Sequence, residues 1–185
     1  MEVKNAVEFL TGKRDARLEE VTLALAAEML VSTGLAATTI QGQEMASAAL
    51  NSGKAADIFG RMVAALGGPS NFMETPDSYL PSAPVIVPMP SPQTGFVSAT
   101  LTREIGLAVV ALGGGRTRPD DKIDHAVGLT SLLPIGTEVQ KGEPLGFVHA
   151  RSEDAAGQAK AQVIAAYVFS EKKPTRHEVI SRRIG

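Results

Sequence analysis

The chain contains no cysteine and no tryptophan, and only 4% of its 185 residues are aromatic. The absence of cysteine excludes disulfides and thiolate metal sites. No apolar run reaches the roughly 20 residues that a membrane-spanning helix requires. The first ten residues mix acidic and basic side chains, which is not typical of a signal peptide. We therefore expect a cytoplasmic protein with no membrane partner.

Strong charge of either sign is also lacking, because the formal net charge is −2. Such a chain has no basic field that would attract nucleic acid, so we expect no nucleic-acid partner. Hydrophobic residues make up 44% of the sequence, which is ordinary for a globular protein. With so few aromatic side chains, the core has to be mainly aliphatic.

The first third of the sequence, residues 1–68, predicts helices separated by glycines. Apolar spacing and glycine stops indicate helices over 2–11, 18–33 and 39–51, the last interrupted by Gly42. Ser52 is the expected N-cap of a fourth helix that continues to Leu66. The second of these helices is apolar on nearly every side, so we expect it to be buried on most sides.

Residues 69–92 form a proline-rich connection with seven prolines. Proline fixes φ and removes a hydrogen-bond donor, so the segment should be extended and irregular. It allows at most an edge strand around "APVIVPM". We place a boundary here between the helical segment and a domain over 93–185.

Residues 93–185 mix strand and helix patterns. Thr102 is a candidate N-cap for a helix that ends at the triple glycine. The expected order is a strand at 95–101, a helix at 102–115, a strand at 123–130, strand–turn–strand at 132–150, a helix at 153–170 and a strand at 177–184. Together the pattern predicts the α+β class: a helical segment followed by a small α+β domain.

The stretch "LGGGRTRPDD" at 112–121 invites comparison with phosphate-binding loops. It matches neither the P-loop nor the dinucleotide fingerprint, because Arg118 stands where a third glycine is needed. The glycines also follow a helix, so they offer no helix N-terminus to an anion. From the residues alone, a helix C-cap and a surface loop of mixed charge are favoured.

Other motifs for catalysis or metal binding are lacking. His125, His149 and His177 lie more than twenty residues apart, without metal-ligand spacing. There is no G-x-S-x-G sequence for a nucleophilic serine. We therefore assign no catalytic, cofactor-binding or metal-binding residue.

The segment "GTEVQKGEPLGFVHA" resembles half of a biotinyl or lipoyl carrier domain. Such domains present a modified lysine on a tight hairpin directly after the strand. Here the strand is followed by Arg151, Ser152, Glu153 and Asp154. A binding module of this type that lacks the carrier lysine is one alternative function.

Four segments, in order along the whole chain, resemble the C-terminal part of the thymidine and pyrimidine-nucleoside phosphorylase family. They are "VEFLTGKRDARLEEVTLALAAEMLVSTG", "NSGKAADIFGRMVAALGG", "TGFVSATLTREIGLAVVALGGGRTRPDDKIDHAVGLTSL" and the carrier-like segment. The resemblance implies that residues 1–68 are the tail of a catalytic α/β lobe. It implies that the domain after the proline-rich connection is barrel-like, of the barrel-sandwich or hammerhead type.

The resemblance also implies a reaction, in which thymidine and phosphate give thymine and 2-deoxyribose 1-phosphate without a metal or another cofactor. The family binds phosphate and pyrimidine through upstream segments that this sequence does not contain. Thymidine and phosphate are therefore expected partners only through that missing part, and the chain alone is expected to be inactive. The parent enzyme is expected to be a homodimer, and this chain a monomer or a weak dimer.

For the loop, the family resemblance implies a mobile lid at the mouth of the active-site cleft. The lid residues are Gly113, Gly114, Gly115, Arg116 and Arg118. Glycines at the base of the loop suit a hinge, because they tolerate large changes of φ and ψ. A sibling phosphorylase with broader pyrimidine specificity, or with a nucleotide substrate, remains a second alternative.

Overall fold

A computed structural model describes residues 1–175 and 178–184, and these divide into two compact units. The helical unit holds residues 2–80 and the tail 178–184; the sheet unit holds Met1 and residues 81–175. The division falls between Leu80 and Pro81, inside the proline-rich connection. The domain limits expected from the sequence, 1–68, 69–92 and 93–185, stay predictions.

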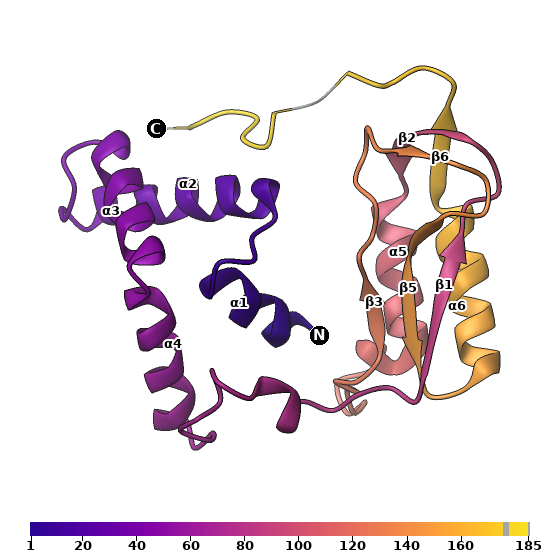
Figure 1. The fold of residues 1–185 in the computed structure, drawn as a ribbon, viewed down its shortest axis with the longest axis horizontal. Helices are drawn as coiled ribbons and strands as arrows, with labels where there is room; N and C mark the ends of the chain where they lie inside the picture. The colour runs from indigo at the N-terminus through magenta and orange to yellow at the C-terminus, as the bar shows by residue number, and fades with distance from the viewer. Residues whose placement is uncertain (176–177, 185) are drawn as a thin grey trace. The chain divides into compact units, whose positions relative to one another are not determined.

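The helical unit contains the four expected helices (Figure 1). Asp15 and Thr38 cap the second and third helices, each accepting a hydrogen bond from a first-turn amide through its side chain. A short 3-10 turn, η1, follows at Pro76–Ser78. The helices are α1 (Glu2–Leu10), α2 (Ala16–Ser32), α3 (Thr39–Asn51) and α4 (Lys54–Ala65). In the described residues, no helix is long and apolar enough to cross a membrane.

Gly42 does not interrupt α3, contrary to the expectation from its helix propensity. It is buried inside the helix, and a Cβ at this position would lie 2.8 Å from the carbonyl oxygen of Ala27 in α2. The missing side chain therefore lets α3 approach the backbone of α2 closely. Tertiary packing outweighs the local cost of a glycine in a helix.

Two further expectations for the helical unit are wrong. Ser52 is the C-cap of α3, whereas Gly53, with φ of 81°, occupies the N-cap position of α4. Helix α2 is not buried on most sides of this chain, since Ala27 is its one residue classed as buried. Leu25 and Met29 are 61% and 69% exposed, so α2 presents apolar surface.

The sheet unit contains two antiparallel three-stranded sheets. One has the order β1-β5-β3, formed by Val85–Pro90, Pro144–Ala150 and Gly128–Thr130. The other has the order β4-β2-β6, formed by Glu138–Val139, Gly95–Thr100 and Tyr167–Ser170. Figure 1 shows β5 between β1 and β3. The proline-containing strand β1 lies at a sheet edge, as expected.

Both sheets pack around one hydrophobic core together with α5 (Thr102–Val109) and α6 (Glu153–Ala165). Its largest fully buried side chains are Met89, Leu145, Val97, Val139, Val148 and Val163. The α+β class is therefore confirmed. Within the described residues, the barrel-like half consists of two sheets sharing a core, with no closed ring of strands.

Several element boundaries in the sheet unit differ from the sequence expectation. Thr102 is the first residue of α5, after Leu101 at the N-cap, and a π turn over Val110–Gly114, labelled η2, ends this helical segment. The strand expected at 123–130 is reduced to β3. The helix expected at 153–170 divides into α6 and β6, because Tyr167–Ser170 pairs with β2. Residues 178–184 form no strand, and His177 lies outside the described residues.

Replacing Gly42 by alanine should destabilise the helical unit, because the added methyl group meets the backbone of α2 rather than a movable side chain. Overpacking of this kind costs about 1–3 kcal/mol. The matched control is Gly157→Ala in α6, where a Cβ meets nothing within 4 Å and the free energy of unfolding should rise by about 0.5–1 kcal/mol. Urea unfolding followed by far-UV circular dichroism measures both. A Gly42→Ala protein as stable as the parent would contradict the close packing.

Candidate functional site

The loop that follows α5 begins at the triple glycine. Gly113 has φ of 92°, a left-handed conformation that glycine adopts without strain. Gly114 and Gly115 lie against the side chains of Val109 and Val110, which a Cβ would approach to 2.8 and 2.7 Å. One glycine therefore turns the chain, and the other two allow the loop to leave the helix end at close range.

A single carboxylate, that of Asp121, organises the loop. Its Oδ2 accepts hydrogen bonds from the amides of Thr117 and Arg118, at 3.0 and 2.8 Å, and from the Thr117 hydroxyl at 2.7 Å. The Thr117 hydroxyl and these amides lower the pKa of Asp121. Arg116 Nε donates to the Asp121 carbonyl oxygen at 3.1 Å. The amides that a phosphate-binding loop would offer to an anion are thus occupied by the loop's own carboxylate.

The guanidinium groups of Arg116 and Arg118 lie on exposed residues of this turn. Within the part of the chain that the structure describes, the Arg118 side chain makes no hydrogen bond or ion pair. Arg116 keeps its Nη donors available, because only its Nε is bonded inside the loop. The loop therefore presents two cations on a backbone that is internally braced.

The return of the loop is held by Asp124. Its amide donates to the carbonyl oxygen of Gly113 at 2.9 Å, and its Oδ1 accepts from the amide of Ala126 at 3.0 Å. Arg151 donates to both carboxylate oxygens, from Nε at 2.5 Å and from Nη2 at 2.8 Å. The Arg151 guanidinium lowers the pKa of Asp124 to about 2. The two ends of the loop are thereby joined.

The two histidines that the structure describes, His125 and His149, do not form a site. His125 is exposed beside Asp124, whereas His149 lies in β5, where its Nε2 is 2.8 Å from Thr130 Oγ1 and burial lowers its pKa. Among residues 1–175 and 178–184, no three His, Cys, Asp or Glu side chains gather as a metal site would require.

The end of β5 also bears on the carrier alternative. The strand ends at Ala150, and Ser152 caps α6 by accepting a hydrogen bond from the amide of Ala155 at 3.2 Å. The chain therefore passes from strand to helix through Arg151, without the lysine-bearing hairpin of a carrier domain. The carrier-like sequence, residues 136–150, instead builds β4, the turn that follows it and β5.

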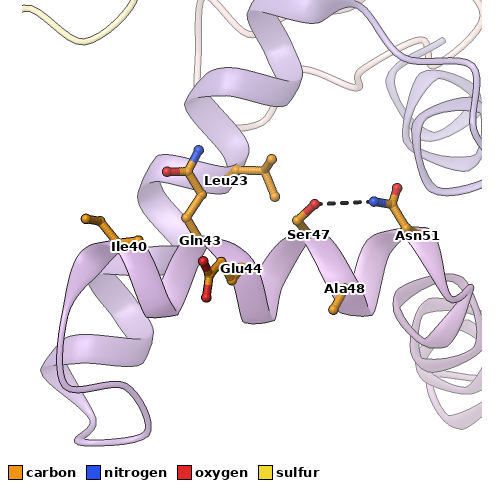
Figure 2. A pocket seen from close by; sticks show the side chains of 7 residues that line it. All are labelled: Leu23, Ile40, Gln43, Glu44, Ser47, Ala48 and Asn51. Atoms are coloured by element: carbon orange, nitrogen blue, oxygen red, sulfur yellow. Dashed lines mark hydrogen bonds between the residues drawn. The ribbon is translucent and has the colours of Figure 1, made fainter.

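Sequence reasoning did not identify the hollow between α2 and α3, which has a volume of about 490 Å³ (Figure 2). Ser47 and Asn51, one turn apart on α3, are joined by a 3.3 Å hydrogen bond that the Asn51 amide donates. Four of the seven lining residues are polar, and Glu44 is the one among them that is charged. Its lining residues are Leu23, Ile40, Gln43, Glu44, Ser47, Ala48 and Asn51.

Removing the Asp121 carboxylate should open the turn. In Asp121→Ala, the amide protons of Thr117 and Arg118 lose their acceptor and should exchange with solvent at least tenfold faster in NMR measurements. Asp120→Ala, at an exposed neighbouring position, is the matched control and should leave these rates unchanged.

The pH dependence of the same amides follows from the lowered pKa of Asp121. In the parent protein their chemical shifts should stay constant above pH 3.8, the ordinary value for aspartate, and should change as pH falls through the lowered pKa. In the exchange experiment, equal rates for the Thr117 and Arg118 amides in Asp121→Ala and Asp120→Ala would show that Asp121 does not brace the loop.

Comparison with known proteins relates the chain to nucleoside phosphorylases. Residues 96–170 match the pyrimidine nucleoside phosphorylase C-terminal domain. Over all 185 residues, the chain is 56% identical to a thymidine phosphorylase of Mesorhizobium japonicum and 47% identical to one of Sinorhizobium medicae. A thymidine phosphorylase of Burkholderia cenocepacia is 52% identical over 172 residues, which are 92% of the chain and 39% of that relative.

The chain spans 42% of the length of the Mesorhizobium and Sinorhizobium relatives. The matched domain covers β2, α5 and the glycine loop, and continues to the end of β6. The resemblance to the C-terminal part of thymidine phosphorylase is therefore confirmed. Residues 96–170 thus match the pyrimidine nucleoside phosphorylase C-terminal domain, within a chain that is similar to thymidine phosphorylases along its whole length.

Proposed function

We propose that this chain serves as the C-terminal portion of a thymidine phosphorylase. The parent enzyme would convert thymidine and phosphate into thymine and 2-deoxyribose 1-phosphate, with no metal or other cofactor, in the cytoplasm. The supporting observation is the unbroken match to thymidine phosphorylases along the whole chain. The chemistry then consists mainly of orienting two substrates and stabilising developing charge.

The role of this portion is structural, with one loop that acts on the site. Thymidine and phosphate bind to residues of the parent enzyme outside this chain, and the sheet unit carries the lid Gly113–Asp121. Support comes from the hinge conformation of Gly113 and from the exposed cations of Arg116 and Arg118. A cation that reaches the reacting phosphate only on closure would stabilise charge without holding phosphate in the open enzyme.

The same proposal covers assembly. Parent enzymes would pair as homodimers through helices that this chain does not contain, so the chain itself would be a monomer or a weak dimer. The exposed apolar residues of α2, Leu25 and Met29 among them, favour weak association rather than a specific interface.

A sibling enzyme is the second candidate. It is favoured by the matched domain family, which is described for pyrimidine nucleosides in general. Relative rates of uridine and thymidine phosphorolysis by the proposed parent enzyme would separate the two candidates.

A chimera tests the main proposal. In it, this chain replaces the matched 42% of the Mesorhizobium japonicum thymidine phosphorylase. We expect phosphate-dependent release of thymine by the chimera and none by the isolated chain, because the substrate-binding groups come from the relative's remaining part. A folded but inactive chimera would contradict the proposed function. Thymine release by the isolated chain that tracks the purified protein would contradict the assignment of those groups.

The lid role has its own test in the same chimera. Arg116→Ala should lower kcat/KM while leaving the affinity of the open enzyme for phosphate nearly unchanged. A residue of a phosphate-binding loop would instead lose about 1.5–3 kcal/mol of phosphate binding, the worth of a hydrogen bond to a charged group. Calorimetric titration of phosphate distinguishes the two. Arg103→Ala, at an 84% exposed side chain on α5, is the control and should change neither quantity.

A further inference from the structure

The loop from Gly113 to Asp124 is closed at its base by one backbone hydrogen bond, from the Asp124 amide to the Gly113 carbonyl oxygen. Gly113 has a left-handed φ of 92°, which glycine adopts without strain, whereas the side chain of Asp124 is held by hydrogen bonds. The Asp124 carboxylate is held from two directions, by the Ala126 amide and by Arg151. The two ends of the loop therefore differ. The end at Asp124 is anchored by side-chain contacts, whereas the end at Gly113 has no side chain to hold it.

Arg151 is well placed to serve as the anchor. It directly follows Ala150, which is completely buried at the end of β5, and directly precedes Ser152, the N-cap of α6. Its backbone is thus set by the core strand on one side and by a capped helix on the other. Figure 1 shows the segment after α5 and the β5–α6 turn at the same end of the sheet unit.

The contact differs from an ordinary surface ion pair in its geometry. Two parallel N–H donors of one guanidinium meet the two oxygens of one carboxylate, which adds orientation to the attraction. The groups facing the Asp124 carboxylate are Arg151, the Ala126 amide and the neighbouring His125, and each favours its ionised form. The Asp124 side chain is 28% exposed and that of Arg151 is 54% exposed, so solvent weakens the attraction between the two charges. The paired hydrogen bonds still fix the orientation of the two groups.

We propose that Asp124 and Arg151 are positioning residues that fix the return end of the lid loop on the sheet unit, so that the loop pivots about Gly113. That the loop acts as a lid rests on the proposed function. That Asp124 and Arg151 anchor it rests on the geometry of their contact alone. Neither residue touches substrate; each acts through the placement of Arg116 and Arg118. Without the pair, the loop would keep its Asp121 turn but lose its fixed orientation.

Hydrogen exchange of the full 185-residue chain, followed by NMR, tests the anchoring. In Arg151→Met, the amides of Asp124 and Ala126 should exchange at least tenfold faster, while the core amides of Val97 and Val148 keep their rates. Arg151→Lys retains the charge but not the paired donors, and should give intermediate rates. Arg103→Met, at an exposed position on α5, should have no effect. An unchanged loop, or an equal rise at loop and core amides, would overturn the inference.

The chimera then separates this inference from the proposed function. If Arg151→Met lowers kcat severalfold, leaves phosphate affinity in the open state unchanged, and is partly rescued by Arg151→Lys, the positioning role is supported. An active chimera whose kcat does not respond to Arg151→Met would overturn that role. A chimera that is inactive with the parent sequence would refute the proposed function, while the exchange rates still decide whether the pair anchors the loop.

Discussion

Strand β5 hydrogen-bonds to neighbours along both of its edges, and the sheet unit depends on this arrangement. Leu145, Val148 and Ala150 are completely buried along it, so a one-residue shift of register would move the core-facing residues to the opposite face. Because the strand leads through Arg151 directly into α6, the same register also fixes where the Arg151 guanidinium lies. The position of the loop anchor is thus a consequence of core packing.

Local signals in the sequence were sufficient for most helices and for the α+β class. Apolar spacing and glycine stops predicted the four N-terminal helices to within two residues. The errors occurred where a distant partner decides the structure. Tyr167–Ser170 continues the pattern of α6 but pairs with β2, and Gly42 resembles a helix breaker until Ala27 is placed against it. A single sequence does not show such partners.

The same limit applies to the loop. Its glycines and arginines could be recognised from composition, and the absence of a phosphate-binding fingerprint argued against that role. The separate tasks of Asp121 and Asp124 could not be recognised, because both belong to a run of mixed charge that resembles a solvated surface. Asp121 became distinctive only when the amides of Thr117 and Arg118 converged on it, and Asp124 only when Arg151 was brought beside it.

Taken together, the two carboxylates divide the mechanics of the loop. Asp121 binds groups within the loop and makes it one internally braced piece, whereas Asp124 ties that piece to the β5–α6 turn. The proposed hinge is Gly113, in its left-handed conformation. A braced loop loses less conformational entropy on closing than a flexible one, since its residues are already ordered before they meet a substrate. In the proposed lid, a single hinge would therefore bring the cations of Arg116 and Arg118 to the substrate, and the energy of closure would be left for stabilising charge.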